Sequence, residues 1–257
     1  MGSRLGQHFL IRDSVLEKIA TAASPEREPL VVEIGPGKGA LTRHLLERTD
    51  RVIAIEVDPY LVHYLRQKFR ESTHLTIVDA DVLKTDLAQW GPAVIAGNLP
   101  YYITSPILER VFAAGAAWKR AVFLVQKEVA ERLTTGPGSR DFGYLTVQTQ
   151  LYSTPEYLFS VPPAAFQPPP KVDSAVVRLD PRQPPLSLDP AAFLRFVSVC
   201  FHLKRKTLRN NLRSAYEPER VDQLEEGGLR AEQLSLEQLI ELYRKVTFPP
   251  PQTSKES

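Results

Sequence analysis

The regular alternation of strand and helix signals along roughly the first 180 residues is the feature that most limits how this chain can fold. Short apolar runs indicate buried strands, and amphipathic segments between them indicate helices. The predicted strands are Leu30–Gly35, Val52–Glu56, Leu75–Asp79, Ala93–Asn98 and Ala121–Gln126. The predicted helices are Ala40–Glu47, Pro59–Phe69 and Ile107–Ala113. This order favours an α/β fold in which helices cover both faces of a mostly parallel sheet.

Two later segments, Tyr144–Ser153 and Val172–Leu179, are rich in β-branched and aromatic residues. They predict an antiparallel pair of strands at the edge of the sheet. The segment between them holds prolines that exclude a helix or an interior strand, so we expect a rigid loop there. These prolines are Pro155, Pro162, Pro163, Pro168, Pro169 and Pro170.

The last part of the chain follows a helical pattern, which begins after a proline-rich stretch at residues 181–185 that is typical of a linker. The predicted helices are Pro190–Leu203, Lys206–Ala215, Pro218–Gly227 and Ser235–Lys245. Ser235 is a good N-cap residue for the last of them, with Gln238 placed to complete a capping box. We therefore predict an α/β domain at residues 1–180, a small α-helical domain at 186–248 and a disordered tail at 249–257.

Glycine and acidic residues follow the first three predicted strands. Gly35, Gly37 and Gly39 form a turn that lets backbone amides approach a ligand closely. Glu56 ends the second strand about 20 residues later, where a carboxylate can accept hydrogen bonds from a ribose diol. Asp81 follows the third strand and can accept from an adenine amino group. The pattern predicts a cofactor that contains adenine and ribose, either a nicotinamide dinucleotide or S-adenosylmethionine.

The tetrapeptide Asn98-Leu99-Pro100-Tyr101 ends the fourth strand and decides between these cofactors. The Asn98 side-chain oxygen and the Leu99 carbonyl can accept both N–H bonds of an exocyclic amino group, which localises the nitrogen lone pair. Pro100 stiffens this backbone, and stacking of the base on Tyr101 is worth about 1–3 kcal/mol. A hydride-transfer site does not need these groups, so we predict methyl transfer from S-adenosylmethionine to an aromatic amine.

Composition restricts the setting of this chemistry. The chain of 257 residues has a net charge of +2 and no apolar run long enough to span a membrane. Its single cysteine, Cys200, cannot form an internal disulfide, which fits a cytoplasmic protein. Because Cys200 lies in an apolar helical run, we expect it in the core. No metal is expected, because four of the histidines have no carboxylate or second histidine at the spacing that a metal site needs. These are His44, His63, His74 and His202.

Positive charge gathers on a short stretch past the first helix of the predicted helical domain, which is typical of phosphate binding. Its residues are Lys204, Arg205, Lys206, Arg209 and Arg213. Arg4 and Lys171 extend this predicted RNA-binding track toward the tetrapeptide. An adenosine in an RNA loop is the expected target, because its amino group must leave the base stack to be methylated.

Several segments together resemble the small-subunit (16S-type) ribosomal RNA adenine N6,N6-dimethyltransferases, the kasugamycin-resistance methyltransferase family. They are 5–10, 33–42, 98–102, 166–176 and 204–212, and the resemblance runs from about residue 4 to 248. It implies a Rossmann-like class I methyltransferase domain with a seven-stranded, mostly parallel sheet and an antiparallel edge. It also implies dimethylation of two adjacent adenosines in the 3′-terminal hairpin loop of small-subunit rRNA during subunit assembly.

The resemblance assigns further site residues. His8, where the family often has asparagine, and Leu10 match positions beside the methionine end of the donor. Phe166 matches an aromatic residue that holds the flipped adenine opposite Tyr101. The other cofactor-binding positions match Gly35, Glu56, Asp81 and Asn98. The implied partner is small-subunit rRNA in a pre-ribosomal particle, and we expect a monomer that uses S-adenosylmethionine without a metal or a membrane.

Three alternatives remain open. The large-subunit rRNA adenine dimethyltransferases of the macrolide-resistance type share the donor site, although Pro169–Ser174 and the basic helix Lys204–Leu212 favour the small-subunit branch. A non-catalytic ribosome-assembly or transcription factor can use the same fold. A DNA or protein N-methyltransferase is disfavoured by Leu99 and by the basic helices.

Overall fold

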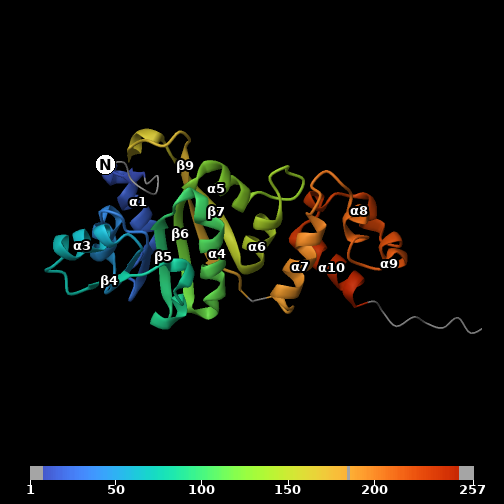
Figure 1. Cartoon of the computed structure of the whole chain (residues 1–257), viewed down its shortest axis with the longest axis horizontal. Coiled ribbons are helices and arrows are strands. Elements are labelled where there is room, and N and C mark those ends of the chain that lie inside the picture. Colours follow the sequence, from blue (N-terminus) through green and yellow to red (C-terminus); the bar gives the residue numbers. More distant parts are fainter. Residues whose placement is uncertain (1–7, 184–185, 249–257) are drawn as a thin grey trace, which may run out of the picture. The chain divides into compact units, whose positions relative to one another are not determined.

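The computed structural model describes residues 8–183 and 186–248, which form two compact units (Figure 1). Within the described part, one unit comprises residues 8–131 and 153–181 and the other comprises 132–152 and 182–248. The linker positions 184–185, the tail 249–257, Arg4 and the motif residues 5–7 lie outside the described residues.

A seven-stranded sheet forms the centre of the first unit, in the order β4-β3-β2-β5-β6-β9-β7. Its strands are β2 (Val31–Ile34), β3 (Val52–Glu56), β4 (Leu75–Asp79), β5 (Ala93–Asn98), β6 (Trp118–Gln126), β7 (Ser153–Val161) and β9 (Ser174–Pro181). The strands from β4 to β6 pair in parallel, whereas β9 pairs antiparallel with both β6 and β7. The predicted mostly parallel sheet with an antiparallel edge is confirmed.

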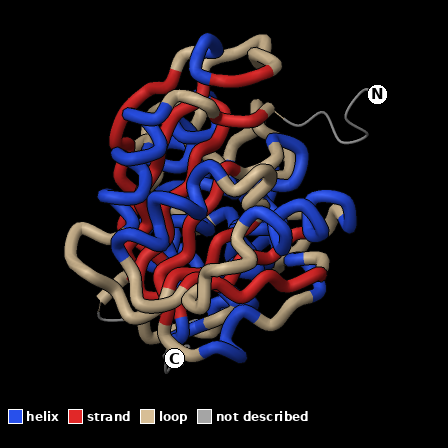
Figure 2. Tube along the Cα trace, turned by 90° about the vertical axis from the view of Figure 1, so that its left-hand side faces the viewer, coloured by secondary structure: helices blue, strands red, loops and turns tan. Residues whose placement is uncertain are grey.

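Helices lie on both faces of this sheet (Figure 2). Val94 and Ala96 of β5 pack in one buried cluster with residues of α1, while Ile95, which points to the opposite face, is also buried. β5 has apolar residues at consecutive positions because both of its faces are buried, as expected for a parallel strand. The helices that begin in this unit are α1 (Asp13–Ala23), α2 (Ala40–Arg48), α3 (Pro59–Lys68), α4 (Thr104–Ala113) and α5 (Lys127–Thr134).

The prediction of a strand at Tyr144–Ser153 is wrong, because Tyr144–Tyr152 forms helix α6. Val147 and Leu151 lie one helical turn apart and are buried in the core of the second unit, and this packing overrides their β-propensity. The edge strand is β7, which contains Pro155. A proline is tolerated there because β7 has a neighbour on one side only, so the predicted proline loop is confined to the residues after Val161.

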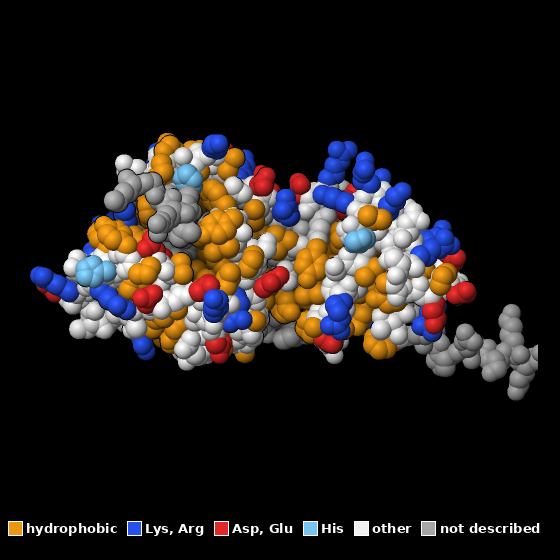
Figure 3. Space-filling view, in the orientation of Figure 1, with side chains coloured by type: hydrophobic (Ala, Val, Ile, Leu, Met, Phe, Trp, Pro, Cys, Tyr) orange, Lys and Arg blue, Asp and Glu red, His pale blue; other side chains and the backbone are white. Residues whose placement is uncertain are grey.

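The second unit is helical, as predicted, but it includes residues 132–152, which the sequence assigned to the α/β domain. Phe142 shows the reason, since it is fully buried in one cluster with Phe193 and Leu239. The remaining helices are α7 (Pro190–Cys200), α8 (Leu208–Leu212), α9 (Pro218–Asp222) and α10 (Leu236–Thr247). Basic side chains gather around α8 on the surface of this unit (Figure 3).

Two details of this unit match the sequence. Ser235 caps α10, and the Ser235 amide donates to the Gln238 side chain at 2.9 Å while the Gln238 amide donates to the Ser235 hydroxyl at 3.3 Å. Cys200 is buried, and burial raises the pKa of its thiol. No helix in the described ranges is both long enough and apolar enough to cross a bilayer.

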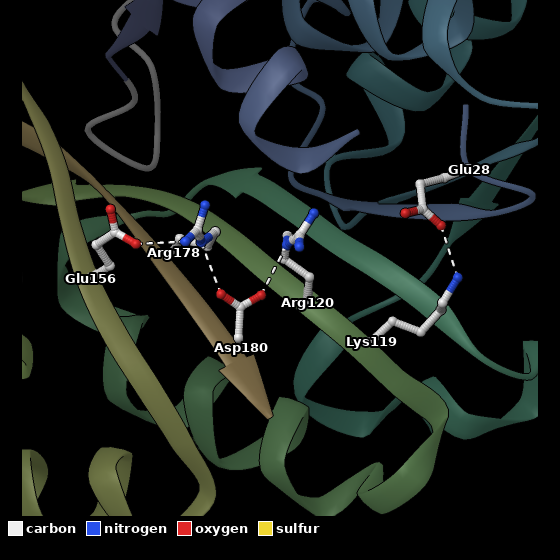
Figure 4. A network of polar contacts seen from close by, with 6 residues as sticks. All are labelled: Glu28, Lys119, Arg120, Glu156, Arg178 and Asp180. Carbon is white, nitrogen blue, oxygen red and sulfur yellow. Dashed lines mark hydrogen bonds and ion pairs between the residues drawn. The ribbon is translucent and has the colours of Figure 1, made fainter. Parts of the chain in front are cut away.

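Charged side chains tie the antiparallel edge of the sheet together at the end where the parallel strands begin (Figure 4). Asp180 of β9 pairs with Arg120 of β6 at 2.9 Å and with Arg178 at 2.8 Å, and Arg178 pairs with Glu156 of β7 at 2.5 Å. Each such half-exposed pair contributes about 1 kcal/mol or less. Their larger effect is on register, because a slip of one residue would separate the charges on neighbouring strands.

Candidate active site

The carboxyl ends of β2, β3 and β5, together with the segment that follows β4, line a cavity of about 390 Å³ in the first unit. Parallel strands place their carboxyl ends at one edge, which is where open α/β sheets bind ligands. The structure brings the predicted cofactor and catalytic residues to this cavity, with the exception of Phe166. The predicted residues that line it are His8, Leu10, Gly35, Glu56, Asp81, Asn98, Leu99, Pro100 and Tyr101.

The glycine turn after β2 needs glycine for two reasons. Gly35, Gly37 and Gly39 have φ angles of 66°, 59° and 73°, in the left-handed region that other residues avoid. A Cβ at Gly37 would also lie 3.1 Å from the ring of Phe9, and one at Gly39 would lie 2.5 Å from Phe69. The turn is therefore enclosed by side chains, and its backbone can approach a ligand in the cavity.

Backbone amides orient the carboxylates of Glu56 and Asp81, the two acidic residues predicted to bind the cofactor. Oε2 of Glu56 accepts from the Gly37 amide at 3.1 Å, and Oε1 accepts from the amides of residues 57–58 at 3.0 and 3.1 Å. Burial raises the pKa of Glu56, although these three hydrogen bonds oppose the shift. Asp81 accepts from the Leu83 amide at 2.9 Å through Oδ1. Since a carboxylate offers about four acceptor positions, both side chains keep acceptor capacity for a ligand.

Glu33 is a site residue that sequence reasoning did not single out. It lines the cavity from the middle of β2, is 1% exposed, and accepts a hydrogen bond of 2.6 Å from the Thr42 hydroxyl. Burial, with a smaller contribution from the nearby Glu56 carboxylate, raises the pKa of Glu33 to about 8, and the hydrogen bonds from Thr42 oppose this shift. A charged residue inside an otherwise apolar strand was the available signal, because such a residue is rarely buried without a partner.

Replacing Glu33 by glutamine should flatten the dependence of stability on pH. The carboxyl titrates near 4.5 in the unfolded chain and near 8 in the folded protein, so between these values the folded state holds a proton that the unfolded state has lost. Stability therefore falls as pH rises across this window, by up to about 1.4 kcal/mol per pH unit from this group. Chemical denaturation of both proteins from acidic to mildly alkaline pH measures this difference, and parallel curves would contradict it.

The tetrapeptide after β5 is held rigidly at the cavity. The Leu99 amide donates to the Leu124 carbonyl of β6 at 3.0 Å, and Leu99 is 1% exposed. The Pro100 carbonyl accepts from the Ile103 amide at 3.1 Å and starts a 3₁₀ turn over Tyr101–Ile103. The side-chain amide nitrogen of Asn98 donates to the main-chain carbonyl of His8 at 3.1 Å.

Tyr101 lies between two partners. Its hydroxyl is 2.8 Å from the hydroxyl of Ser174 at the start of β9, and the ring of His8 stacks on it with centroids 6.2 Å apart. Burial raises the pKa of Tyr101, with the Ser174 hydrogen bond opposing the shift. Sequence reasoning missed Ser174, because no local pattern marks a partner 73 positions away.

Phe166, the predicted partner of Tyr101 in holding the base, does not line this cavity in the structure. It is 3% exposed and belongs to a buried cluster with Leu10 and Leu16. The cause is a two-stranded sheet in which β8 (Phe166–Gln167) pairs antiparallel with β1 (Phe9–Leu10), so that Phe166 lies opposite Leu10. The structure therefore gives Phe166 a packing role beneath the N-terminal strand.

The predicted basic cluster divides into two groups. Lys204, Arg205 and Lys206 are exposed on the turn between α7 and α8. The prediction that they belong to a basic helix is wrong. Arg209 and Arg213 instead form ion pairs with Asp222 of α9, at 3.6 and 2.6 Å. Lys171 is exposed in the first unit. The described ranges contain no group of three or more His, Cys, Asp or Glu side chains arranged to hold a metal ion.

The strand order, the glycine turn and the polar residues at the strand ends define a Rossmann-like methyltransferase. Within that class, the chain belongs to the ribosomal RNA adenine dimethylase family, whose sequence model matches residues 2–247. It is 45% identical over 253 residues to the ribosomal RNA small subunit methyltransferase A of Acidobacterium capsulatum, covering 94% of this chain and 89% of the relative. The relative of the same name from Coxiella burnetii is 38% identical, with 94% and 96% covered.

Solved structures agree with this assignment. The chain resembles a dimethyladenosine transferase from Plasmodium falciparum with a TM-score of 0.80 and 25% identity, covering 91% of this chain and 96% of the other. It also resembles the 23S rRNA methyltransferase ErmE with a TM-score of 0.73 and 32% identity, covering 93% and 99%. Both similarities extend over more than nine-tenths of this chain.

Proposed function

We propose that this protein is an S-adenosylmethionine-dependent methyltransferase that dimethylates N6 of two adjacent adenosines in the 3′-terminal hairpin loop of small-subunit rRNA. One observation carries the proposal. Asn98 and Tyr101 lie together at the cavity where the parallel strands end, in a chain whose relatives are named small subunit methyltransferases. The proposal includes a pre-ribosomal particle as the substrate, a monomeric enzyme and a cytoplasmic location.

The residues around the cavity fit the proposed methyl donor. Glu56 keeps an acceptor position for a ribose hydroxyl on Oε2, and Asp81 keeps Oδ2 for an adenine amino group. The glycine turn, Leu10 and His8 also line the cavity. The bound donor supplies an electrophilic methyl group. The protein has to bind and orient the target base and make its amino group reactive.

On the acceptor side, the protein has to make a weak nucleophile reactive. The lone pair of an adenine amino group is delocalised into the ring, so the nitrogen reacts poorly while it remains planar. Acceptance of its two N–H bonds by Oδ1 of Asn98 and the carbonyl of Leu99 draws the nitrogen toward tetrahedral geometry. Stacking on Tyr101 holds the base in position. No general base is needed before transfer, because the proton can leave afterwards.

Reversing the charge of Lys204, Arg205 and Lys206 to glutamate should weaken binding to small-subunit rRNA at least about tenfold at moderate salt. Each lost phosphate contact should also lower the slope of log affinity against log salt by about 1. Binding titrations at several salt concentrations measure both effects. Reversal of three exposed arginines of the first unit, Arg51, Arg66 and Arg70, provides the charge-matched control. Equal slopes for the two triple variants would place the RNA contacts elsewhere.

The experiment that tests the proposed function uses labelled S-adenosylmethionine and identifies the methylated nucleoside by mass. One reaction contains small subunits that lack the adenine dimethylation, and a parallel reaction contains protein-free large-subunit rRNA. We expect N6,N6-dimethyladenosine in the small subunit only. Label in large-subunit RNA alone would favour the second candidate, a macrolide-resistance type enzyme, which the similarity to ErmE supports. Donor binding without label in either RNA would favour a non-catalytic assembly factor.

A further inference from the structure

The proposed reaction depends on which way the side-chain amide of Asn98 points. An asparagine amide has an oxygen that only accepts hydrogen bonds and a nitrogen that only donates them. The amino group of an adenine brings N–H bonds, so the amide must present Oδ1 to it. With the amide turned by 180°, Nδ2 would face the target nitrogen and two sets of N–H bonds would oppose each other. Something in the protein has to exclude that orientation.

The main-chain carbonyl of His8 supplies this selection. It lies 3.1 Å from Nδ2 of Asn98, on a segment 90 positions away in the sequence. A carbonyl oxygen cannot donate a hydrogen bond. If Oδ1 of Asn98 faced it, two acceptors would lie against each other, so Nδ2 must face the His8 carbonyl. Oδ1 is then the end of the amide that remains for the target amino group.

His8 is itself fixed from three sides. Its ring nitrogen Nδ1 lies 2.8 Å from the main-chain carbonyl of Pro168, and a carbonyl partner requires Nδ1 to carry the proton and donate. The ring stacks on Tyr101. The backbone after His8 pairs with β8, and the Ile11 amide donates to the Ala165 carbonyl at 2.8 Å. The position of the His8 carbonyl is therefore set by the proline loop and not by local sequence.

We propose that His8 is a positioning residue whose main-chain carbonyl sets the orientation of the Asn98 amide, with the Pro168 carbonyl holding His8 in place. The inference rests on the proposed function, since it concerns how Asn98 accepts the target amino group. It assigns the N-terminal strand, which lines the cavity, and the proline loop, which does not, a joint role in the chemistry.

Asn98→Asp tests this inference sharply. The variant keeps an oxygen for the target amino group, so it should stay active if acceptance is the only requirement. If donation to His8 is required, the ionised carboxylate of the variant places an acceptor against a carbonyl, and we expect a loss of about a hundredfold or more near pH 8. Protonation restores a donor on one oxygen and an acceptor on the other. Activity relative to wild type should therefore recover at least about tenfold when pH falls toward about 5.5.

The wild-type protein, measured at every pH, corrects for other titrating groups in the same cavity. The ionisable side chains that line it are those of His8, Glu33, Lys38, Glu56, Asp81, Tyr101 and Tyr102. Titration with S-adenosylhomocysteine shows that each variant still binds the product of the donor. Asn98→Asp with wild-type activity near pH 8, or without recovery in acid, would overturn the inference. Full activity in Asn98→Ala would instead overturn the proposed site, so the two failures are distinguishable.

A second variant tests the hold on His8. His8→Phe keeps an aromatic ring against Tyr101 but removes the hydrogen bond to the Pro168 carbonyl, whereas His8→Asn keeps a side-chain donor. We expect kcat to fall about tenfold or more in His8→Phe, with a smaller change in KM for the donor. His8→Asn should retain most of the wild-type kcat. Equal kcat in the two variants would show that the hydrogen bond to Pro168 does not position His8.

Discussion

Replacing Asn98 by alanine should lower the rate of methyl transfer by about three orders of magnitude or more, while binding of S-adenosylmethionine changes little. The side chain supplies one of the two acceptors for the target amino group, and alanine leaves that group held by the Leu99 carbonyl alone. The side chain is half-buried at the end of β5, so its removal disturbs little of the core. Single-turnover transfer to unmethylated small subunits measures the rate, and calorimetric titration measures donor affinity.

Glu56→Ala is the matched contrast for this prediction. Its carboxylate accepts three backbone amides and lies beside the glycine turn, so its loss should weaken donor binding by about tenfold or more. Transfer at saturating donor should fall much less than in Asn98→Ala. An Asn98→Ala protein with normal turnover, or a Glu56→Ala protein with normal donor affinity, would contradict the site described here.

The sequence predicted the sheet well because parallel strands buried on two faces are nearly continuous apolar runs. β3 and β5 agree residue for residue with the predicted strands, and so does β4, although it lies at the edge of the sheet and is only partly buried. Their polar residues could also be placed in advance, because the carboxyl ends of parallel strands always meet at one edge. Gly35, Glu56, Asp81 and Asn98 line one cavity for this reason.

The sequence failed where tertiary packing decides. The residues of α6 have strand-like composition, but burial of Val147 and Leu151 in a helical core selects the helix. Helix α1 was not predicted, although Val15, Leu16 and Ile19 repeat at helical spacing on its buried face. The place of Phe166 outside the cavity was also missed, because its pairing opposite Leu10 depends on a strand contact that no local pattern reveals.

Three of the site contacts that were missed join distant segments. The hydrogen bonds from Asn98 to His8, from His8 to Pro168 and between Tyr101 and Ser174 each span more than 70 positions. Two of them end on a main-chain carbonyl, which every residue has, so no residue type marks the position. Motifs can therefore locate the reacting groups in a chain like this, while the groups that orient them require the structure.

Gly97→Ala should destabilise the sheet-containing unit by about 3 kcal/mol and weaken donor binding at the same time. Gly97 precedes the catalytic tetrapeptide in β5 and lies opposite Ile34 of β2 in the parallel register. A Cβ at this position would lie 2.5 Å from the Ile34 carbonyl oxygen, and backbone cannot rotate aside as a side chain can. β2 and β5 must therefore separate, and these two strands carry the glycine turn and Asn98.

Thermal unfolding followed by circular dichroism and titration with S-adenosylhomocysteine measure the two consequences together. We expect the unfolding midpoint to fall by about 6–12 °C. Gly136→Ala is the matched control, because a Cβ at Gly136 meets nothing within 4 Å, and it should leave the stability unchanged or raise it by up to about 1 kcal/mol. A Gly97→Ala protein with the midpoint and affinity of wild type would mean that the contact between β2 and β5 is looser than described. In that case the close approach of these strands would not be what aligns the donor turn with Asn98.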